Sequence, residues 1–158
     1  MNSFPKKVLI ASDHAGIELK SAIQKALSEW SWEDLGPLNS GRVDYPDFAE
    51  QLAQKISNES LNGNQLMGVL ICGSGIGMSI AANKIPGIRA AVVENPVSAR
   101  LSREHNNANV LCLGSRFIAP EYGAEIVKTW LETPFSEDQR HLGRLQKITE
   151  LENKFLKK

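Results

Sequence analysis

The chain has 158 residues and no net charge, because 18 Lys and Arg residues balance 18 Asp and Glu residues. This length suits one domain, residues 1–158, with a core of its own. The balanced charge gives neither nucleic acid nor a membrane surface an electrostatic reason to bind, and no stretch has the length of a membrane span. A small-molecule site is therefore expected.

The start of the chain and its two cysteines bear on the cellular compartment. The apolar run at residues 8–11 is too short for the hydrophobic region of a signal peptide, and the polar residues Asp13 and His14 follow it. We therefore expect a cytoplasmic protein in which Cys72 and Cys112 are reduced.

Short apolar runs of strand length alternate with helical patterns along the chain. Strands are expected at residues 8–11, 32–35, 67–71, 88–93 and 110–113. Helices are expected to begin near residues 15, 46, 76, 96 and 120. This alternation predicts an α/β fold, a three-layer α/β/α sandwich in which helices cover both faces of a five-stranded parallel sheet.

A long amphipathic helix is expected at the end of the chain, over about residues 137–156. Ser136 and Gln139 have the spacing of a capping box, and apolar residues recur at helical spacing from Leu142 to Phe155. No strand follows this helix. Its apolar face can therefore cover its own domain or bind a partner.

A glycine-rich turn follows the third expected strand. Cys72 ends the strand, and glycines at 73, 75 and 77 precede the next helix. Glycines allow a tight turn with uncovered N–H groups, and a helix N-terminus adds partial positive charge. The turn should favour an anion and the thiolate form of Cys72. A lone cysteine at a strand end is otherwise more often a small buried hydrophobic residue.

Several candidate residues follow strands of the predicted sheet. Asp13 and His14 follow the first strand, Cys72 follows the third, and Gly114, Ser115 and Arg116 follow the fifth. Ligands of parallel sheets bind beyond the carboxyl ends of the strands. These residues are therefore expected to form one site.

Two other kinds of site are open at this point. The glycine turn is related to a dinucleotide fingerprint, for which Glu94 has the expected spacing, but Met78 stands where the third glycine belongs. Asp13, His14, His105 and His141 could gather around a divalent ion, although no pair has a typical metal-ligand spacing.

Several motifs closely resemble those of the type B ribose-5-phosphate isomerases and occur in that family's order. They are Asp13-His14-Ala15-Gly16, Asp44-Tyr45-Pro46, the segment 72–84, the segment 102–107, Gly114-Ser115-Arg116 and the segment 140–144. The resemblance implies a Rossmann-like sheet of order 2-1-3-5-4 and a homodimer, or a tetramer, with sites built across the subunit interface. It implies interconversion of D-ribose 5-phosphate and D-ribulose 5-phosphate through an enediolate, in the pentose phosphate pathway, with no cofactor and no metal.

The resemblance also implies which residues act. Cys72 transfers the proton, the Ser74 hydroxyl manages protons between the sugar oxygens, and His105 opens the sugar ring. The residues expected to bind substrate are Asp13, His14, Tyr45, Gly73, Gly75, Ile76, Gly77, Asn106, Arg116, Arg140 and Arg144. Two alternatives remain open: an isomerase of six-carbon sugar phosphates, such as allose or galactose 6-phosphate, and a non-catalytic phosphosugar-binding module.

Overall fold

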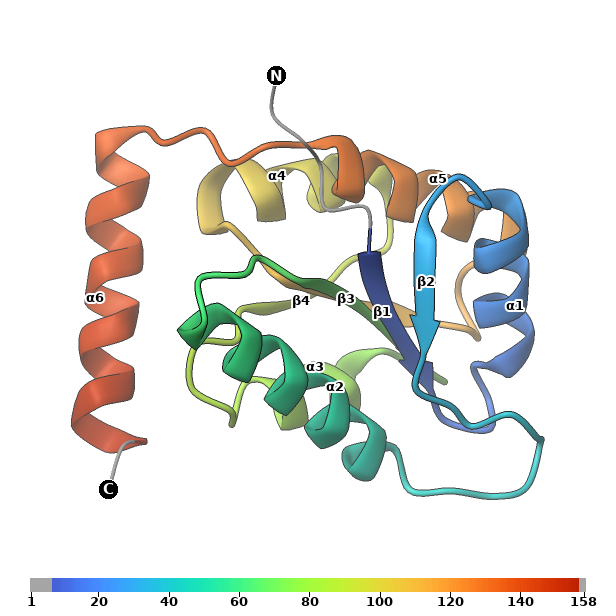
Figure 1. Cartoon of the computed structure of the whole chain (residues 1–158). Helices are drawn as coiled ribbons and strands as arrows, with labels where there is room; N and C mark the ends of the chain where they lie inside the picture. Colours follow the sequence, from blue (N-terminus) through green and yellow to red (C-terminus); the bar gives the residue numbers. More distant parts are fainter. Residues whose placement is uncertain (1–6, 157–158) are drawn as a thin grey trace.

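The computed structural model describes residues 7–156, which form one parallel sheet and six helices. The strands are β1 (Lys7–Ser12), β2 (Ser31–Asp34), β3 (Met67–Cys72), β4 (Ala90–Val92) and β5 (Val110–Gly114). The helices are α1 (Ile17–Ala26), α2 (Tyr45–Leu61), α3 (Ile76–Ala82), α4 (Pro96–Asn106), α5 (Pro120–Glu132) and α6 (Gln139–Phe155) (Figure 1). The expected α/β alternation is confirmed.

The order across the sheet is β2-β1-β3-β5-β4, as the family resemblance implied, and all strand pairs are parallel. Ser12 pairs with Ile71, and Cys72 pairs with Gly114. The carboxyl ends of β1, β3 and β5 therefore meet at one edge. Helices α2 and α3 pack on one face, and α1, α4 and α5 pack on the other (Figure 1).

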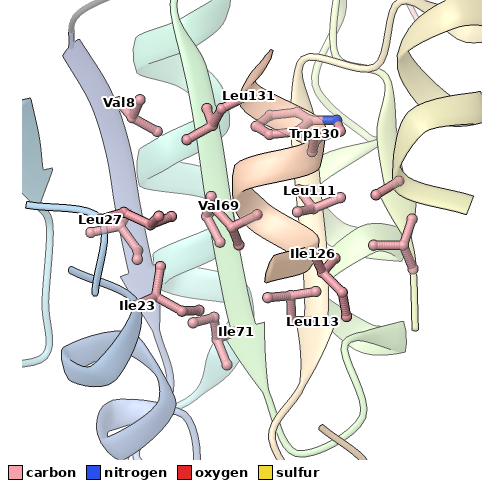
Figure 2. Close-up of a cluster of buried hydrophobic side chains, with 14 of the residues drawn as sticks. Val8, Ile23, Leu27, Val69, Ile71, Leu111, Leu113, Ile126, Trp130 and Leu131 are labelled. Carbon is pink, nitrogen blue, oxygen red and sulfur yellow. The ribbon is translucent and has the colours of Figure 1, made fainter. Parts of the chain in front are cut away.

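Alternate residues of the strands enter two separate cores. Val69 and Ile71 of β3 belong to the core that contains Trp130 of α5 (Figure 2). Leu70 and Cys72 belong to the core beneath α2 and α3. Successive side chains of a strand point to opposite faces, and each fully buried Leu or Ile contributes about 1.5–3 kcal/mol relative to an exposed one. This alternation places Cys72 on the α2 and α3 side.

Helix α3 forms as expected, but the face that it buries is not the one that carries its recurring isoleucines. Ile76 and Ile80 are 55% and 57% exposed, whereas Met78 and Ala82 are buried against the sheet. The recurring isoleucines therefore mark the outer face of this helix.

The expected capping box at the start of α6 is wrong. The cap residue is Asp138, whose carboxylate accepts the backbone N–H of Arg140 at 2.9 Å. The Ser136 hydroxyl instead donates to the carbonyl of Glu104 at 2.6 Å. Ser136 thus ties the segment before α6 to the end of α4.

Helix α6 stands apart from the two helical layers (Figure 1). Within its described residues, His141 is the buried one, and apolar side chains such as Leu151 and Phe155 are exposed. Near its far end, the Glu152 carboxylate accepts the backbone N–H of Gly87 at 3.1 Å. The helix is therefore attached at both ends while its apolar face is uncovered. In the described part of the chain, no helix combines the length and hydropathy needed to cross a membrane.

The outer edge of β4 is occupied by a side chain. The Asn83 side-chain amide donates to the carbonyl of Ala90 at 2.9 Å and accepts its N–H at 2.8 Å. Asn83 thus supplies both hydrogen bonds that a neighbouring strand would otherwise make with Ala90.

Candidate active site

The turn after β3 holds the sulfur of Cys72 in a fixed place. The backbone N–H of Gly75 donates to Cys72 Sγ at 3.1 Å, and the Cys72 carbonyl accepts the N–H of Ser115 at 2.9 Å. Gly75 has φ of +76°, and a Cβ there would lie 2.9 Å from the carbonyl carbon of Leu113. A side chain at this position would be strained and would clash, so the turn requires glycine.

The two cysteines occupy different environments. Cys72 is 5% exposed and borders the cavity described below, whereas Cys112 is fully buried in the core beneath α2 and α3. Burial raises the pKa of the Cys112 thiol, and the neighbouring Cys72 raises it further. Cys112 is therefore a protonated packing residue at neutral pH.

A cavity of about 560 Å³ lies at the carboxyl edge of the sheet. Its lining residues come from the end of β3, from the loops after β1, β2, β3 and β5, and from the first turns of α2 and α3. They are Asp13, His14, Ala15, Ser40, Arg42, Tyr45, Cys72, Gly73, Ser74, Gly77 and Arg116. Asp13, His14, Cys72 and Arg116 thus line one cavity, as expected for residues that follow strands one, three and five, whereas Gly114 and Ser115 are not among its lining residues.

Asp13 and His14 are both held by backbone groups. One carboxylate oxygen of Asp13 accepts the N–H of Ala15 at 2.9 Å, which orders the turn before α1. His14 Nδ1 accepts the N–H of Val43 at 3.4 Å. This contact leaves Nε2 to carry the proton of the neutral ring. His14 also links the β1 loop to the loop before α2.

Tyr45 forms a wall of the cavity because residue 77 is glycine. A Cβ on Gly77 would lie 2.6 Å from Cζ of the Tyr45 ring. The ring therefore rests directly on the first turn of α3. In the loop just before α3, the Ser74 hydroxyl oxygen accepts the N–H of Ile76 at 3.3 Å.

The loop after β2 adds residues that sequence reasoning missed. Ser40 and Arg42 line the cavity, and Arg42 is exposed. The rule that ligands bind beyond the carboxyl ends of parallel strands applies to β2 as well. Applied to the loop after Asp34, it would have included Ser40 and Arg42 in the predicted site. Arg42 and Arg116 bring two guanidinium groups to this edge of the sheet.

Four expected site residues lie elsewhere in the same chain. His105 and Asn106 end α4, and a helix that follows a parallel strand ends at the opposite edge of the sheet. Gly68 pairs with Val110 at that edge, and Cys72 pairs with Gly114 at the other. Four residues of strand span roughly 13 Å. Within one chain, His105 and Asn106 therefore cannot join Cys72.

Arg140 and Arg144 belong to this second group. Both are exposed on α6, whose first turn lies by the end of α4. Next to them, the rings of His105 and His141 stack with centroids 4.3 Å apart and an interplanar angle of 18°. Burial lowers the pKa of His141, and the neighbouring His105 and arginines lower it further. A neutral imidazole thus packs against His105.

The strand order bears on the dinucleotide alternative. That fingerprint places its acidic residue at the end of the strand next to the glycine turn. Glu94 follows β4, and β5 lies between β4 and β3. Glu94 is therefore separated from the turn after Cys72, and the geometry disfavours a dinucleotide.

The metal alternative has no support from the side-chain arrangement. Asp13 and His14 lie at the carboxyl edge, whereas His105 and His141 lie at the amino edge. Among residues 7–156, no three His, Cys, Asp or Glu side chains are grouped in a way that could hold an ion. The four candidate ligands do not converge within one chain.

The cavity combines a thiol, backbone N–H groups and cationic side chains. A thiol can exchange a proton with carbon, N–H groups can stabilise an oxyanion, and guanidinium groups bind phosphate. The arrangement suits proton transfer on a phosphorylated substrate that passes through an enediolate.

Comparisons with known proteins agree with this chemistry. A family model described as Ribose/Galactose Isomerase matches residues 8–148. Ribose-5-phosphate isomerase B of Escherichia coli is 44% identical over 151 residues, or 94% of this chain and 98% of that protein. D-erythrulose-4-phosphate isomerase of Pectobacterium atrosepticum is 41% identical over 137 residues, or 81% of this chain and 84% of that protein.

A solved relative shares the whole fold. The crystal structure of ribose-5-phosphate isomerase B from Mycoplasma genitalium with bound ribulose-5-phosphate has a TM-score of 0.86 at 41% identity. The match covers 93% of this chain and 96% of that one. This chain belongs to the ribose/galactose isomerase family.

Proposed function

We propose that this chain interconverts D-ribose 5-phosphate and D-ribulose 5-phosphate. The observation that carries the proposal is the sulfur of Cys72, which borders a cationic cavity and accepts the N–H of Gly75 at 3.1 Å. The similarity to ribose-5-phosphate isomerases B, one of them with bound ribulose-5-phosphate, supports it. Isomerisation moves a proton between adjacent carbons, so the proposal includes neither a redox cofactor nor a metal.

In this proposal Cys72 is the base. Its thiolate removes the C2 proton of linear ribose 5-phosphate, and the resulting thiol returns a proton to C1 of the enediolate. The hydrogen bond from Gly75 stabilises the thiolate. The N–H groups of Gly75 and Ile76 already have partners within the turn. The remaining N–H groups, such as that of Gly73, therefore stabilise the oxyanion of the enediolate. Ser74 moves the proton between the sugar oxygens.

The complete site in this proposal uses two copies of the chain. One copy supplies the cavity with Cys72, and the other supplies His105, Asn106 and the α6 arginines. The support is geometric, because the two groups occupy opposite edges of the sheet. An isologous dimer would bring the amino edge of each subunit to the carboxyl edge of the other. The uncovered apolar side chains of α6 and of α3, such as Ile80 and Leu151, are suited to that interface.

The roles at the shared site follow from chemistry. His105 opens the furanose ring, since the carbonyl exists only in the linear sugar, and Asn106 and Asp13 hold hydroxyl groups. Arg140 and Arg144 are four residues apart on one helical face, which lets both bind one phosphate. Arg116 and His14 approach that phosphate from the first subunit.

A second candidate substrate deserves a direct test, because one relative is named for D-erythrulose 4-phosphate. Purified protein should be assayed with ribose 5-phosphate, erythrose 4-phosphate, allose 6-phosphate and galactose 6-phosphate, with and without a chelator. We expect ribose 5-phosphate to give the highest kcat/KM and the chelator to have no effect. A higher kcat/KM on another phosphosugar would make that phosphosugar the assigned substrate. Activity that is lost with the chelator and restored by a divalent metal would overturn the metal-free mechanism.

A further inference from the structure

The end of α4 that carries His105 and Asn106 is held by two arginine side chains, Arg89 from outside the helix and Arg103 from within it. The last carbonyls of a helix lack partners within it. Here the Nε–H of Arg89 donates to the carbonyls of Asn106 and Asn107, each at 3.0 Å. Arg103 Nη1 donates to the carbonyl of Ala108 at 2.7 Å. Two guanidinium groups thus satisfy three successive carbonyls around the helix end.

Arg103 and Asn107 give this end its shape. Asn107 has φ of +45°, and its side-chain oxygen accepts from Arg103 Nη1 at 2.8 Å. Arg103 Nε also donates to the carbonyl of Thr133 at 3.2 Å. Burial lowers the pKa of Arg103 to about 10, so it stays charged at neutral pH. Arg103 is fixed within its own helix and to the chain after α5.

Arg89 differs because it reaches α4 from a separate, rigid segment. The backbone N–H of Arg89 donates to the side chain of Asn109 at 2.8 Å, and the Asn109 amide donates to the carbonyl of Gly87 at 2.9 Å. Gly87 in turn donates its N–H to the Glu152 carboxylate of α6. The backbone on each side of Arg89 is therefore anchored before its side chain extends.

The contacts of Arg89 join both elements of the second residue group. Its guanidinium holds the end of α4 at Asn106, and its segment holds α6 through Glu152. Burial lowers the pKa of Arg89, and the negative charge of Glu152 opposes this shift. A charged donor to a carbonyl is roughly twice as strong as a neutral one. Arg89 therefore fixes where α4 ends relative to α6.

We propose that Arg89 is a positioning residue for ring opening, acting through the backbone of Asn106 and Asn107 to orient His105 and Asn106. The proposal rests on the proposed function, in which His105 opens the furanose ring. A misplacement of about 1 Å in a catalytic group can cost on the order of 10²-fold in rate. Loss of the Arg89 contacts should therefore impair ring opening more than proton transfer at Cys72.

The test separates ring opening from proton transfer. Turnover of ribose 5-phosphate requires both steps. Exchange of the C1 protons of ribulose 5-phosphate with solvent deuterium requires enediolate formation alone, because O5 carries the phosphate and the ketose cannot form a furanose. Arg89→Met, Arg89→Lys and His105→Ala are compared with the parent by both measurements, and folding is checked by urea unfolding. Arg100→Met, an exposed arginine on α4, is the matched control.

We expect Arg89→Met to lose about tenfold or more in ribose 5-phosphate turnover while its deuterium exchange stays near the parental rate. Arg89→Lys keeps the charge and a donor, so its turnover should lie between those of Arg89→Met and the parent. Arg100→Met should match the parent in both measurements. Parental turnover in Arg89→Met, or an equal loss in both measurements, would overturn the positioning role. If Arg89→Met does not fold, Arg89→Lys decides by the same two measurements. A parent protein inactive in both would instead refute the proposed function.

Discussion

The backbone N–H of Gly75 donates directly to the sulfur of Cys72, across a distance of 3.1 Å. Gly75 follows Cys72 by three positions in the sequence, and its left-handed conformation closes the turn between them. The hydrogen bond fixes the position of the sulfur. One geometric feature thus selects glycine at position 75 and places the thiol at the border of the cavity.

Cys72→Ser tests the role of this sulfur. A serine hydroxyl is too weak an acid to supply the base, so turnover should fall by at least about 10²-fold while phosphosugar binding persists. Cys112→Ala is the matched control, and it should lose stability through a cavity but keep turnover. Iodoacetamide should modify Cys72 and leave Cys112 unmodified, since burial raises the pKa of Cys112. Parental turnover in folded Cys72→Ser would remove Cys72 from the mechanism.

Gly77→Ala tests the wall formed by Tyr45. The added Cβ would lie 2.6 Å from Tyr45 Cζ, so the ring must move away from α3. Overpacking of this kind costs about 1–3 kcal/mol in the free energy of unfolding, and KM should rise. Gly143 is a useful control because a Cβ there meets no atom within 4 Å in the described chain. An unchanged KM in Gly77→Ala would show that Tyr45 does not shape the substrate site.

Arg140→Ala and Arg144→Ala test the phosphate contacts. Each variant should lose a charge-assisted hydrogen bond of about 1.5–3 kcal/mol, which corresponds to a tenfold or larger rise in KM. Lys154→Ala, at the other end of α6, should leave KM unchanged. Steady-state kinetics with ribose 5-phosphate measure the effect. The assignment fails if both arginine variants keep the parental KM.

Mixing two inactive variants tests whether each site spans two subunits. Cys72→Ala and His105→Ala are co-refolded, and mixed dimers are verified by differential tagging. In a mixed dimer with shared sites, one site carries both substitutions and the other carries neither. Random mixing should therefore restore about a quarter of the parental activity. Proven mixed dimers without activity would contradict a site that is shared between two subunits.

His141 predicts a pH dependence of stability. Its folded-state pKa lies below its ordinary value of 6.5, chiefly because of burial. The unfolded chain therefore binds this proton more readily, and the free energy of unfolding should fall as the pH drops below about 6.5. This loss ends once the pH passes the folded-state pKa. His141→Phe keeps a ring beside His105 and removes the titration, so its urea-unfolding curve should change less between pH 7 and 5.5. An equal change in both proteins contradicts the prediction.

Much of the fold could be predicted because its signals are local. Apolar runs such as Met67–Cys72 mark buried strands, and proline marks the starts of α4 and α5. The strand order came from the family resemblance, since periodicity carries no information about which strands are neighbours. Capping at Asp138 was missed because Ser136 fits the same pattern, and its contact with Glu104 depends on tertiary structure.

The candidate site was predictable only where one rule about strand ends applied. That rule gathered Asp13, Cys72 and Arg116, and it would have found Arg42 if applied to β2. It could not bring in His105, which lies at the end of a helix and at the other edge of the sheet. In the proposed function His105 comes from a second copy of the chain, and a pattern within one sequence does not show how two copies would pack.

The side-chain amide of Asn83 on the outer edge of β4 also bears on solubility. An open sheet edge offers unpaired N–H and C=O groups on which another chain can add a strand and start aggregation. Here Ala90, on a strand of three residues, already has both outward groups bonded. A substitution such as Asn83→Ala would expose those groups. The protein would then become prone to intermolecular sheet growth during folding at high concentration, whatever its effect on catalysis.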